Sequence, residues 1–292
     1  MLNLDKHCTV IIPAFNEEAV IARCLSSLLD TAPPDHKMEV IVAANGCVDS
    51  TVQIAAETAL DATILDIKKP SKTGAINAAN AQANHYPRIY LDADIECSYS
   101  VIVALVNALG ESGTMAAAPA IRLDTDHSDL LVKAYYRVWL KQPYASSGNG
   151  GAGCYALSRT AINEAGEFPD IIGDDIWIHT RFEQAQKRYV SEDKSGNPVF
   201  TIVRPPKNVL DLIKVEARKQ VGNAEITRLF PSPHGAQLRG TGGISAAFRS
   251  GNRLLDIFVF FAIKLSARLL AQVNRLLGRG SAWSRDVSAR QP

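Results

Sequence analysis

Short apolar runs alternate with amphipathic helical patterns from residue 8 to residue 91, and this rhythm constrains the fold more than any other feature of the sequence. Strands that alternate with helices of about a dozen residues form βαβ units. Such units place their strands in a mostly parallel sheet, with helices covering both faces. The predicted strands are residues 8–15, 38–44, 62–67 and 88–91, and the predicted helices are residues 17–29, 49–60 and 72–84.

The rhythm is weaker beyond Asp94. A Gly- and Ser-rich stretch at residues 145–153 predicts a flexible loop, and the Gly-, Ser- and Ala-rich residues 235–253 predict a linker or a mobile loop. The strongly apolar residues 254–277 predict a long C-terminal helix. Further predicted strands are residues 115–121 and 199–203, and further predicted helices are residues 129–140 and 175–188.

The charge balance excludes a dedicated nucleic-acid-binding protein. Lys and Arg total 31, Asp and Glu total 30, and the formal net charge is +1, whereas nucleic-acid binders carry a clear basic excess. The charge is unevenly distributed, because eight basic residues and two acids give +6 over residues 240–292 and leave −5 for residues 1–239. A basic C-terminal segment on a mildly acidic body suggests an anionic partner.

The cysteines and the apolar segments indicate a cytoplasmic protein. The five cysteines are odd in number and none has C-x-x-C spacing, so the pattern predicts neither a disulfide framework nor a zinc site. The N-terminal residues contain no apolar signal core, and no uncharged apolar run reaches the ~18 residues that a spanning helix requires. We therefore expect a protein of the reducing cytoplasm with no membrane-spanning helix.

Polar side chains follow three of the predicted strands at the point where each strand ends. Residues 13–18 (PAFNEE), residues 45–51 (NGCVDST) and residues 92–94 (DAD) hold these positions. In an open parallel sheet, ligands bind outside the carboxyl ends of the strands. We therefore expect the three clusters to form one site.

Asp92 and Asp94 are the most specific of these residues. Two carboxylates at the end of an apolar strand provide the hard oxygen ligands that suit Mg²⁺ or Mn²⁺, which commonly bridge to substrate phosphates. The alternative is a strand-end turn with solvated acids. The position at a sheet edge favours the metal.

Five motifs in order resemble the inverting family 2 glycosyltransferases of GT-A fold: VIIPAFNEE, NGCVDST, KTGAINAAN, the D-x-D and the acidic pair Asp174-Asp175. The resemblance covers about residues 7–225. It implies a Rossmann-like, mostly parallel sheet flanked by helices in a catalytic domain of residues 1–234. An amphipathic helical extension of residues 254–292 would follow. It also implies a metal-dependent enzyme that moves a sugar from a nucleotide-diphosphate sugar to an acceptor hydroxyl.

The resemblance implies a donor site at the carboxyl edge of the sheet. Asp94, with Asp92, would hold the metal on the donor diphosphate, and Asp92 would also lie near the ribose or the donor sugar. A UDP-sugar is the first expectation, although Ala44 stands where the family usually has an acid that contacts the base. Lys72 and Arg218 have the alternative of solvated surface positions. The residues expected to bind the donor are Pro13, Ala14, Phe15, Glu17, Asn45, Lys72, Asp92 and Arg218.

The resemblance places the chemistry on the acidic pair. Asp175 would be the general base that takes a proton from the acceptor hydroxyl, and Asp174 would be a neighbour that raises its pKa by like-charge repulsion. The alternative for the pair is the N-terminus of a helix. Trp177 would stack on an acceptor sugar or fill the core. Gly150 and Gly151 would lie near the donor sugar and the acceptor.

Two other functions stay open at this point. A nucleotidyltransferase acting on a sugar phosphate also uses a parallel sheet and carboxylate-held Mg²⁺, but residues 16–18 after the first strand are Asn-Glu-Glu, not a basic triphosphate loop. A degenerate family member could act as a membrane-bound scaffold, which the intact D-x-D and acidic pair disfavour.

The C-terminal helix leaves three alternatives: packing on the domain, lying on an anionic membrane surface, or forming a dimer contact. The membrane alternative fits a peripheral enzyme on the inner face of the membrane. A sugar or lipid-linked acceptor in polysaccharide or glycolipid assembly would suit that location.

Overall fold

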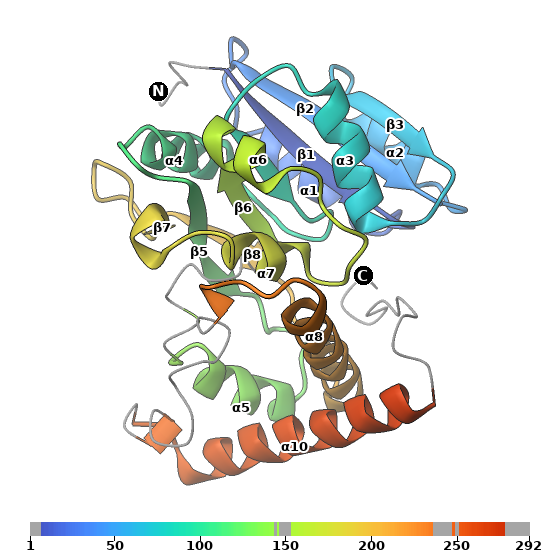
Figure 1. Ribbon diagram of the computed structural model, residues 1–292, viewed down its shortest axis with the longest axis vertical. Coiled ribbons are helices and arrows are strands. Elements are labelled where there is room, and N and C mark those ends of the chain that lie inside the picture. Colours follow the sequence, from blue (N-terminus) through green and yellow to red (C-terminus); the bar gives the residue numbers. More distant parts are fainter. Residues whose placement is uncertain (1–6, 143–144, 146–152, 236–246, 249–250, 278–292) are drawn as a thin grey trace.

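The computed structural model describes residues 7–142, 145, 153–235, 247–248 and 251–277 (Figure 1). Gly150 and Gly151 and most of the expected linker at residues 235–253 lie outside the described residues.

Eight strands of the described chain form a mixed sheet in the order β3-β2-β1-β4-β6-β5-β7, with β8 paired to β5. β1, β2, β3 and β4 are parallel, whereas β6 is antiparallel to both of its neighbours, β4 and β5. The mostly parallel α/β sheet expected from the sequence is therefore confirmed. The strands are β1 (Cys8–Ala14), β2 (Met38–Asn45), β3 (Thr63–Ile67), β4 (Arg88–Leu91), β5 (Ala116–Leu123), β6 (Cys154–Leu157), β7 (Lys187–Val190) and β8 (Phe200–Val203).

The sheet is buried on both faces, which explains why its central strands are apolar throughout. Successive side chains of a strand point to opposite faces, so Val10 and Ile12 of β1 join one core cluster and Ile11 joins another. Helices α1 (Ile21–Leu29), α2 (Thr51–Thr58) and α4 (Tyr99–Leu109) contribute to the first cluster. Helices α3 (Lys72–Gln82), α6 (Arg159–Ala165) and α7 (Asp174–His179) contribute to the second (Figure 1).

Three further helices form a separate layer beside this α/β unit: α5 (Leu130–Trp139), α8 (Val209–Leu229) and α10 (Leu254–Leu276) (Figure 1). Their own apolar cluster joins them, and the rings of Tyr135 on α5 and Phe260 on α10 stack with centroids 5.0 Å apart. α10 therefore packs on the domain, which was one of the three alternatives for this segment.

Two ion pairs hold α10 against its neighbours. The Arg137 guanidinium of α5 binds both carboxylate oxygens of Asp256, at 2.8 and 2.7 Å. Lys264 of α10 donates to Glu216 of α8 at 2.6 Å. Asp256 and Glu216 are 4% and 3% exposed, so both acids depend on these partners. The Lys219 and Lys264 charges outweigh the effect of burial and lower the pKa of Glu216 to about 2.

The predicted helix over residues 175–188 is wrong. α7 ends at His179, a single 3₁₀ turn, η2 (Gln184–Gln186), follows, and the chain then enters β7. Phe182 is 2% exposed in the core, and Glu183 and Gln186 form a capping box that starts the new turn. β7 then pairs in parallel with β5, a long-range contact that helical periodicity cannot register. The sequence pattern also did not predict α4, β6 or α6.

None of the helices in the described part of the chain combines the length and the apolar character needed to cross a lipid bilayer.

Lys264→Met tests the clamp on α10. The substitution removes the 2.6 Å partner of the buried Glu216 carboxylate and leaves it the longer 3.3 Å contact to Lys219 and a hydrogen bond with Tyr135, so we expect the free energy of unfolding to fall by about 3 kcal/mol. This loss should be largest above the pH at which an unfolded Glu ionises and should shrink as the pH falls towards about 2, where Glu216 itself protonates. Urea unfolding followed by circular dichroism measures the change.

The double variant Glu216→Gln, Lys264→Met should recover much of the loss, because it removes the unpaired charge. Lys214→Met is the matched control, since its pair with Asp211 is largely exposed and exposed pairs contribute ~0–1 kcal/mol. Equal losses for Lys264→Met and Lys214→Met would contradict the clamp.

Candidate active site

The candidate site lies at the carboxyl ends of β1 and β4. The chain proceeds from β1 outward to β2 and β3 and then returns to place β4 on the other side of β1, so the strand order reverses between β1 and β4. Such a reversal opens a crevice in which α/β proteins bind ligands. The three polar clusters expected from the sequence follow β1, β2 and β4 at this edge.

Hydrogen bonds join the loops after β1 and β2 into one unit. Asn16 has a φ of +49° and its side-chain oxygen accepts from the Val48 amide at 2.7 Å. The Glu17 amide donates to the Thr51 hydroxyl at 2.6 Å, and that hydroxyl donates to Asp49. Glu17 is 5% exposed, so it is buried where the two loops meet. These bonds delay α1 until Ile21, four residues after its predicted start.

Asn45 is buried, and backbone groups occupy its amide. Its side-chain nitrogen donates to the carbonyl of Ala14 at 2.8 Å, and its side-chain oxygen accepts from the Ser71 amide at 3.1 Å. The residue therefore ties the ends of β1 and β2 to the start of α3. These contacts give Asn45 a positioning role, and its direct contact with a donor stays a prediction.

Lys72 lies at the centre of the site. It is the first residue of α3, and its ammonium contacts Asp92 at 2.7 Å and Asp174 at 2.8 Å. Ser71 caps the helix by accepting from the Gly74 amide at 3.0 Å, which fixes the start of α3 and so the position of Lys72. Residues from α3, from the end of β4 and from α7 thus meet around one cation, although Asp174 lies about a hundred residues after Lys72 in the sequence.

Tyr155 supports this cluster and was not expected from the sequence. Its buried hydroxyl donates to the second oxygen of Asp174 at 2.9 Å. The antiparallel pairing of β6 with β4 sets Tyr155 beside Tyr90, and their rings stack with centroids 4.9 Å apart. Nothing in the local sequence indicates this contact, because it follows from the insertion of β6 into the sheet. Behind it, burial lowers the pKa of the His179 imidazole to about 3, so this histidine is neutral and structural.

The loop that carries the acidic pair is fixed from two sides. Asn77 of α3 exchanges two hydrogen bonds with the backbone of Phe168, at 2.8 and 2.9 Å. On the other side, a Cβ at Gly222 of α8 would lie 2.8 Å from the Ile172 carbonyl oxygen, so only glycine permits this close approach. Gly173 turns the chain into α7 with a φ of +97°. Asn77 of the KTGAINAAN motif therefore fixes the loop that carries the acidic pair.

Charges in the cluster shift its pKa values in a consistent pattern. Burial raises the pKa of Asp175 to about 6, the Asp174 carboxylate adds to the rise, and the Lys72 cation opposes it. Burial also raises the pKa of Asp92, again against the Lys72 charge. Burial alone would lower the pKa of Lys72, but Asp174, Asp92 and Asp175 outweigh it and the pKa rises. Lys72 therefore stays charged, while Asp175 titrates near neutral pH.

A metal would need ligands from the substrate as well as from the protein. Within residues 7–235 and 247–277, as far as they are described, no three His, Cys, Asp or Glu side chains gather into a metal-binding set. Asp92 and Asp94 supply carboxylate oxygens, and Mg²⁺ sites commonly combine one or two carboxylates with substrate phosphates. The donor set fits a cation that arrives with a diphosphate.

The other expected residues are spread around this centre. Pro13 and Ala14 are buried at the end of β1, Phe15 is half-buried beyond them, and Asp94 is half-buried beside Asp92. Arg218 lies one turn before Gly222, on the face of α8 that packs on the acidic loop.

Trp177 is 3% exposed and packs against Phe168, with centroids 5.3 Å apart. Of its two alternatives, filling the core describes it, because a buried ring cannot stack on an acceptor. Of the glycines in residues 148–153, the structure describes Gly153. Its carbonyl accepts a hydrogen bond from the Asp92 amide at 2.7 Å, so it contacts the D-x-D motif.

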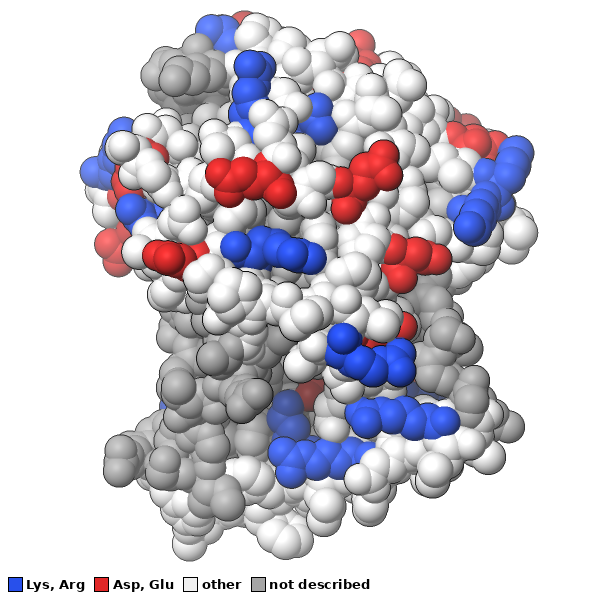
Figure 2. All heavy atoms as spheres, in the orientation of Figure 1, with Lys and Arg blue, Asp and Glu red and all other residues white. Residues whose placement is uncertain are grey.

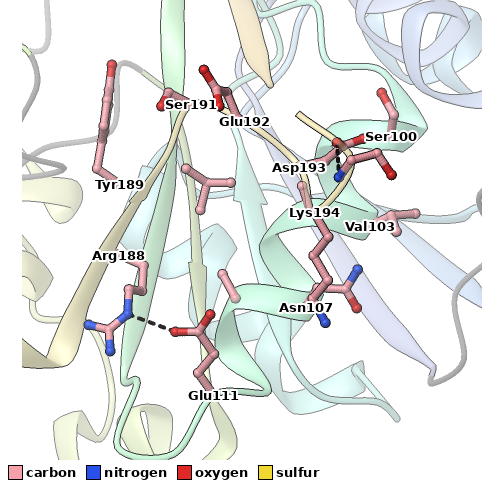
Figure 3. A pocket seen from close by; sticks show the side chains of 14 residues that line it. Ser100, Val103, Asn107, Glu111, Arg188, Tyr189, Ser191, Glu192, Asp193 and Lys194 are labelled. Carbon is pink, nitrogen blue, oxygen red and sulfur yellow. Dashed lines mark hydrogen bonds and ion pairs between the residues drawn. The ribbon is translucent and has the colours of Figure 1, made fainter. Parts of the chain in front are cut away.

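A cavity of about 340 Å³ lies elsewhere, between α4 and residues 188–195 (Figure 3). Arg188 and Glu111, which both line this cavity, form an ion pair at 3.0 Å. Its lining shares no residue with the cluster around Lys72. This cavity is therefore not part of the candidate active site.

Comparison with protein families agrees with this geometry. The model of Glycosyl transferase family 2 matches residues 9–160, which include β1, the D-x-D and β6. The chain is therefore a member of Glycosyl transferase family 2, and it is a glycosyltransferase. Among curated proteins, none matches the chain.

Two solved structures are similar to this chain. The mannosyltransferase PcManGT from Pyrobaculum calidifontis, in complex with GDP-Man and Mn²⁺, is 20% identical and superposes with a TM-score of 0.60 over 96% of this chain and 83% of its own. Glucosyl-3-phosphoglycerate synthase from Mycobacterium tuberculosis, in complex with Mn²⁺, UDP and glucosyl-3-phosphoglycerate, is 21% identical, with a TM-score of 0.49 over 64% of this chain and 70% of its own. The first likeness supports the GT-A fold over nearly the whole chain.

Gly222→Ala tests whether α8 positions the acidic loop. The new methyl group would lie 2.8 Å from the Ile172 carbonyl and must displace it, and a displacement of about 1 Å at a catalytic group lowers kcat/KM by roughly a hundredfold. Alanine also gains about 1 kcal/mol of helix propensity over glycine, so the thermal midpoint should change less than activity does. Steady-state kinetics of donor consumption measure the effect.

Gly235→Ala is the matched control, because a Cβ there has nothing within 4 Å. Full activity of Gly222→Ala would contradict the positioning role of α8.

Proposed function

We propose that this chain is an inverting, metal-dependent glycosyltransferase that moves a sugar from a nucleotide-diphosphate sugar to an acceptor hydroxyl. The observation that carries the proposal is the meeting of Lys72, Asp92 and Asp174 at the reversal of strand order, beside a carboxylate whose pKa burial has raised. The family match favours glycosyl transfer over the nucleotidyltransferase and scaffold alternatives.

Asp175 is the proposed general base. A base with a pKa near 6 is ionised at neutral pH and still accepts a proton readily. As the acceptor oxygen bonds to the anomeric carbon, its proton passes to Asp175 and the bond from that carbon to the diphosphate oxygen breaks. The acceptor enters opposite the leaving group, so the anomeric configuration inverts. Lys72 and Tyr155 donate to the two oxygens of Asp174, which leaves Asp175 as the proposed base of the pair.

Asp94 and Asp92 are the proposed ligands of Mn²⁺ or Mg²⁺ on the donor diphosphate. When bound, the cation would stabilise the negative charge of the departing diphosphate. The PcManGT complex with GDP-Man and Mn²⁺ supports this chemistry by likeness of fold. Lys72 and Arg218 are the proposed protein cations for the phosphates. Lys72 would turn from its carboxylate partners towards the incoming anion.

The loop residues Pro13, Ala14, Phe15 and Glu17 are the proposed floor for the nucleoside, with Asn45 holding that floor in place. A UDP-sugar remains the proposed donor. Gly150 and Gly151 remain proposed neighbours of the donor sugar and the acceptor. The proposed acceptor is a sugar or a lipid-linked sugar in polysaccharide or glycolipid assembly, with the enzyme working in the cytoplasm, at the inner face of the membrane.

Asp175→Asn tests the base. The amide cannot accept the proton, so we expect kcat to fall by roughly 10²–10⁴-fold while donor affinity stays within a fewfold. In the wild-type enzyme, kcat/KM should fall as the pH drops below about 6, because protonation removes the base. Both are measured by chromatography of the released nucleotide, which should be a nucleoside diphosphate.

Asp61→Asn is the control, since Asp61 is exposed in the turn before β3, away from the site. Near-normal turnover of Asp175→Asn would disprove the base assignment, and release of pyrophosphate would point to nucleotidyl transfer.

Asp94→Ala tests the metal. The variant lacks one of the two protein carboxylates proposed to hold the cation. We expect the factor by which Mn²⁺ lowers the Kd of a nucleoside diphosphate to be at least about tenfold smaller in the variant than in the wild-type protein. Calorimetric titration of UDP and GDP, each with and without Mn²⁺, measures this factor and shows which nucleobase the site prefers. Asp61→Ala serves as the control, and an unchanged Mn²⁺ effect in Asp94→Ala would refute the role.

A further inference from the structure

α10 has two apolar faces, and only one of them is packed. Its inner face, with Ile257, Phe260 and Ile263, is buried against α5 and α8. Its outer face carries a second row of large apolar side chains that are 48–86% exposed. These residues recur at helical spacing and form one continuous line, here named the outer stripe: Leu254, Phe258, Leu265, Leu269, Val273 and Leu276.

Basic side chains flank the outer stripe, and no exposed acid accompanies them on α10. Arg253, Arg268 and Arg275 are exposed. The only acid of α10 is Asp256, which is 4% exposed and paired with Arg137 on the inner face. The Lys264 charge is likewise paired within the protein, with Glu216 of α8. The exposed part of α10 is therefore apolar and cationic.

The position of α10 suits contact with a flat surface. The helix forms one edge of the molecule, and its outer face points away from the sheet (Figure 1). From Phe258 to Leu276 the stripe runs about 27 Å at ~1.5 Å per residue. On the face shown in Figure 2, most acidic side chains lie over the α/β unit, whereas basic ones lie over both the α/β unit and the helical layer.

We propose that the outer stripe is a docking surface for an anionic lipid bilayer, with α10 lying flat in the headgroup region. An interfacial helix buries an apolar face to a depth of ~5–10 Å while basic side chains at its margins contact acidic headgroups. The ion pairs and the apolar inner face keep α10 folded on the enzyme during this contact. Packing on the domain and lying on a membrane are thus properties of two faces of the same helix.

Charge complementarity favours lipid over a second copy of the chain. Two copies that met through their outer stripes would bring the rows of arginine together with no exposed acid of α10 to compensate them. An acidic bilayer supplies that compensation. The inference deepens the proposed function, on which it rests for the lipid-linked acceptor, because a helix docked in this way would hold the catalytic unit beside such a substrate.

The test is vesicle flotation of the full chain with phosphatidylcholine vesicles that contain or lack phosphatidylglycerol. We expect flotation only with phosphatidylglycerol, reduced in high salt because screening weakens surface charge interactions. The triple variant Phe258→Glu, Leu265→Glu, Leu269→Glu should lose at least about tenfold in vesicle affinity, since it removes three apolar contacts and adds three negative charges. All three positions are more than half exposed, so the thermal midpoint should stay close to that of the wild type.

Leu60→Glu is the matched control, because Leu60 is 86% exposed but lies at the end of α2. The inference is overturned if the wild-type protein does not float, if the triple variant floats equally well, or if the stripe only mediates a dimer that the variant dissociates. Transfer to a soluble acceptor separates the two proposals. A protein that transfers the sugar but does not float would contradict only the docking surface. A protein that floats but transfers no sugar would contradict only the proposed function.

Discussion

The contact of one ammonium group with two carboxylates organises the catalytic part of this glycosyltransferase. Lys72 joins Asp92, which follows β4, to Asp174, which begins α7. Without that cation, three buried or half-buried acids would repel one another at the edge of the sheet, and Asp175 would hold its proton at still higher pH. In the proposed function, the same charge would meet the phosphates of the donor once it binds.

The rest of the fold fixes where these charges can be. Ser71 caps α3 and so sets the start of the helix that carries Lys72, while Asn77, one and a half turns further on, grips the loop before Asp174. Gly222 lets α8 press on the same loop from the other side. The helical layer of α5, α8 and α10 thus contacts the site through α8, and the proposed docking surface lies on the opposite side of this layer.

Much of the fold could be predicted from local pattern. The parallel part of the sheet follows from apolar runs that alternate with helices, because β1, β2 and β4 are buried on both faces. The prediction was wrong at residues 180–188, where pairing of β7 with β5 overrides helical periodicity. Tyr155 could not have been found, since its contact with Asp174 depends on an antiparallel strand inserted between two distant ones.

By itself the sequence determined the α/β class, the polar loops at the strand ends and the family, because these depend on residue type and spacing along the chain. The roles of the acids stay a prediction. Only the tertiary structure decided that Lys72 bridges Asp92 and Asp174, that Asn45 is occupied by backbone, that Trp177 is core and that α10 has one packed and one exposed apolar face. Those properties depend on which groups meet across long stretches of chain, and periodicity carries no information about such meetings.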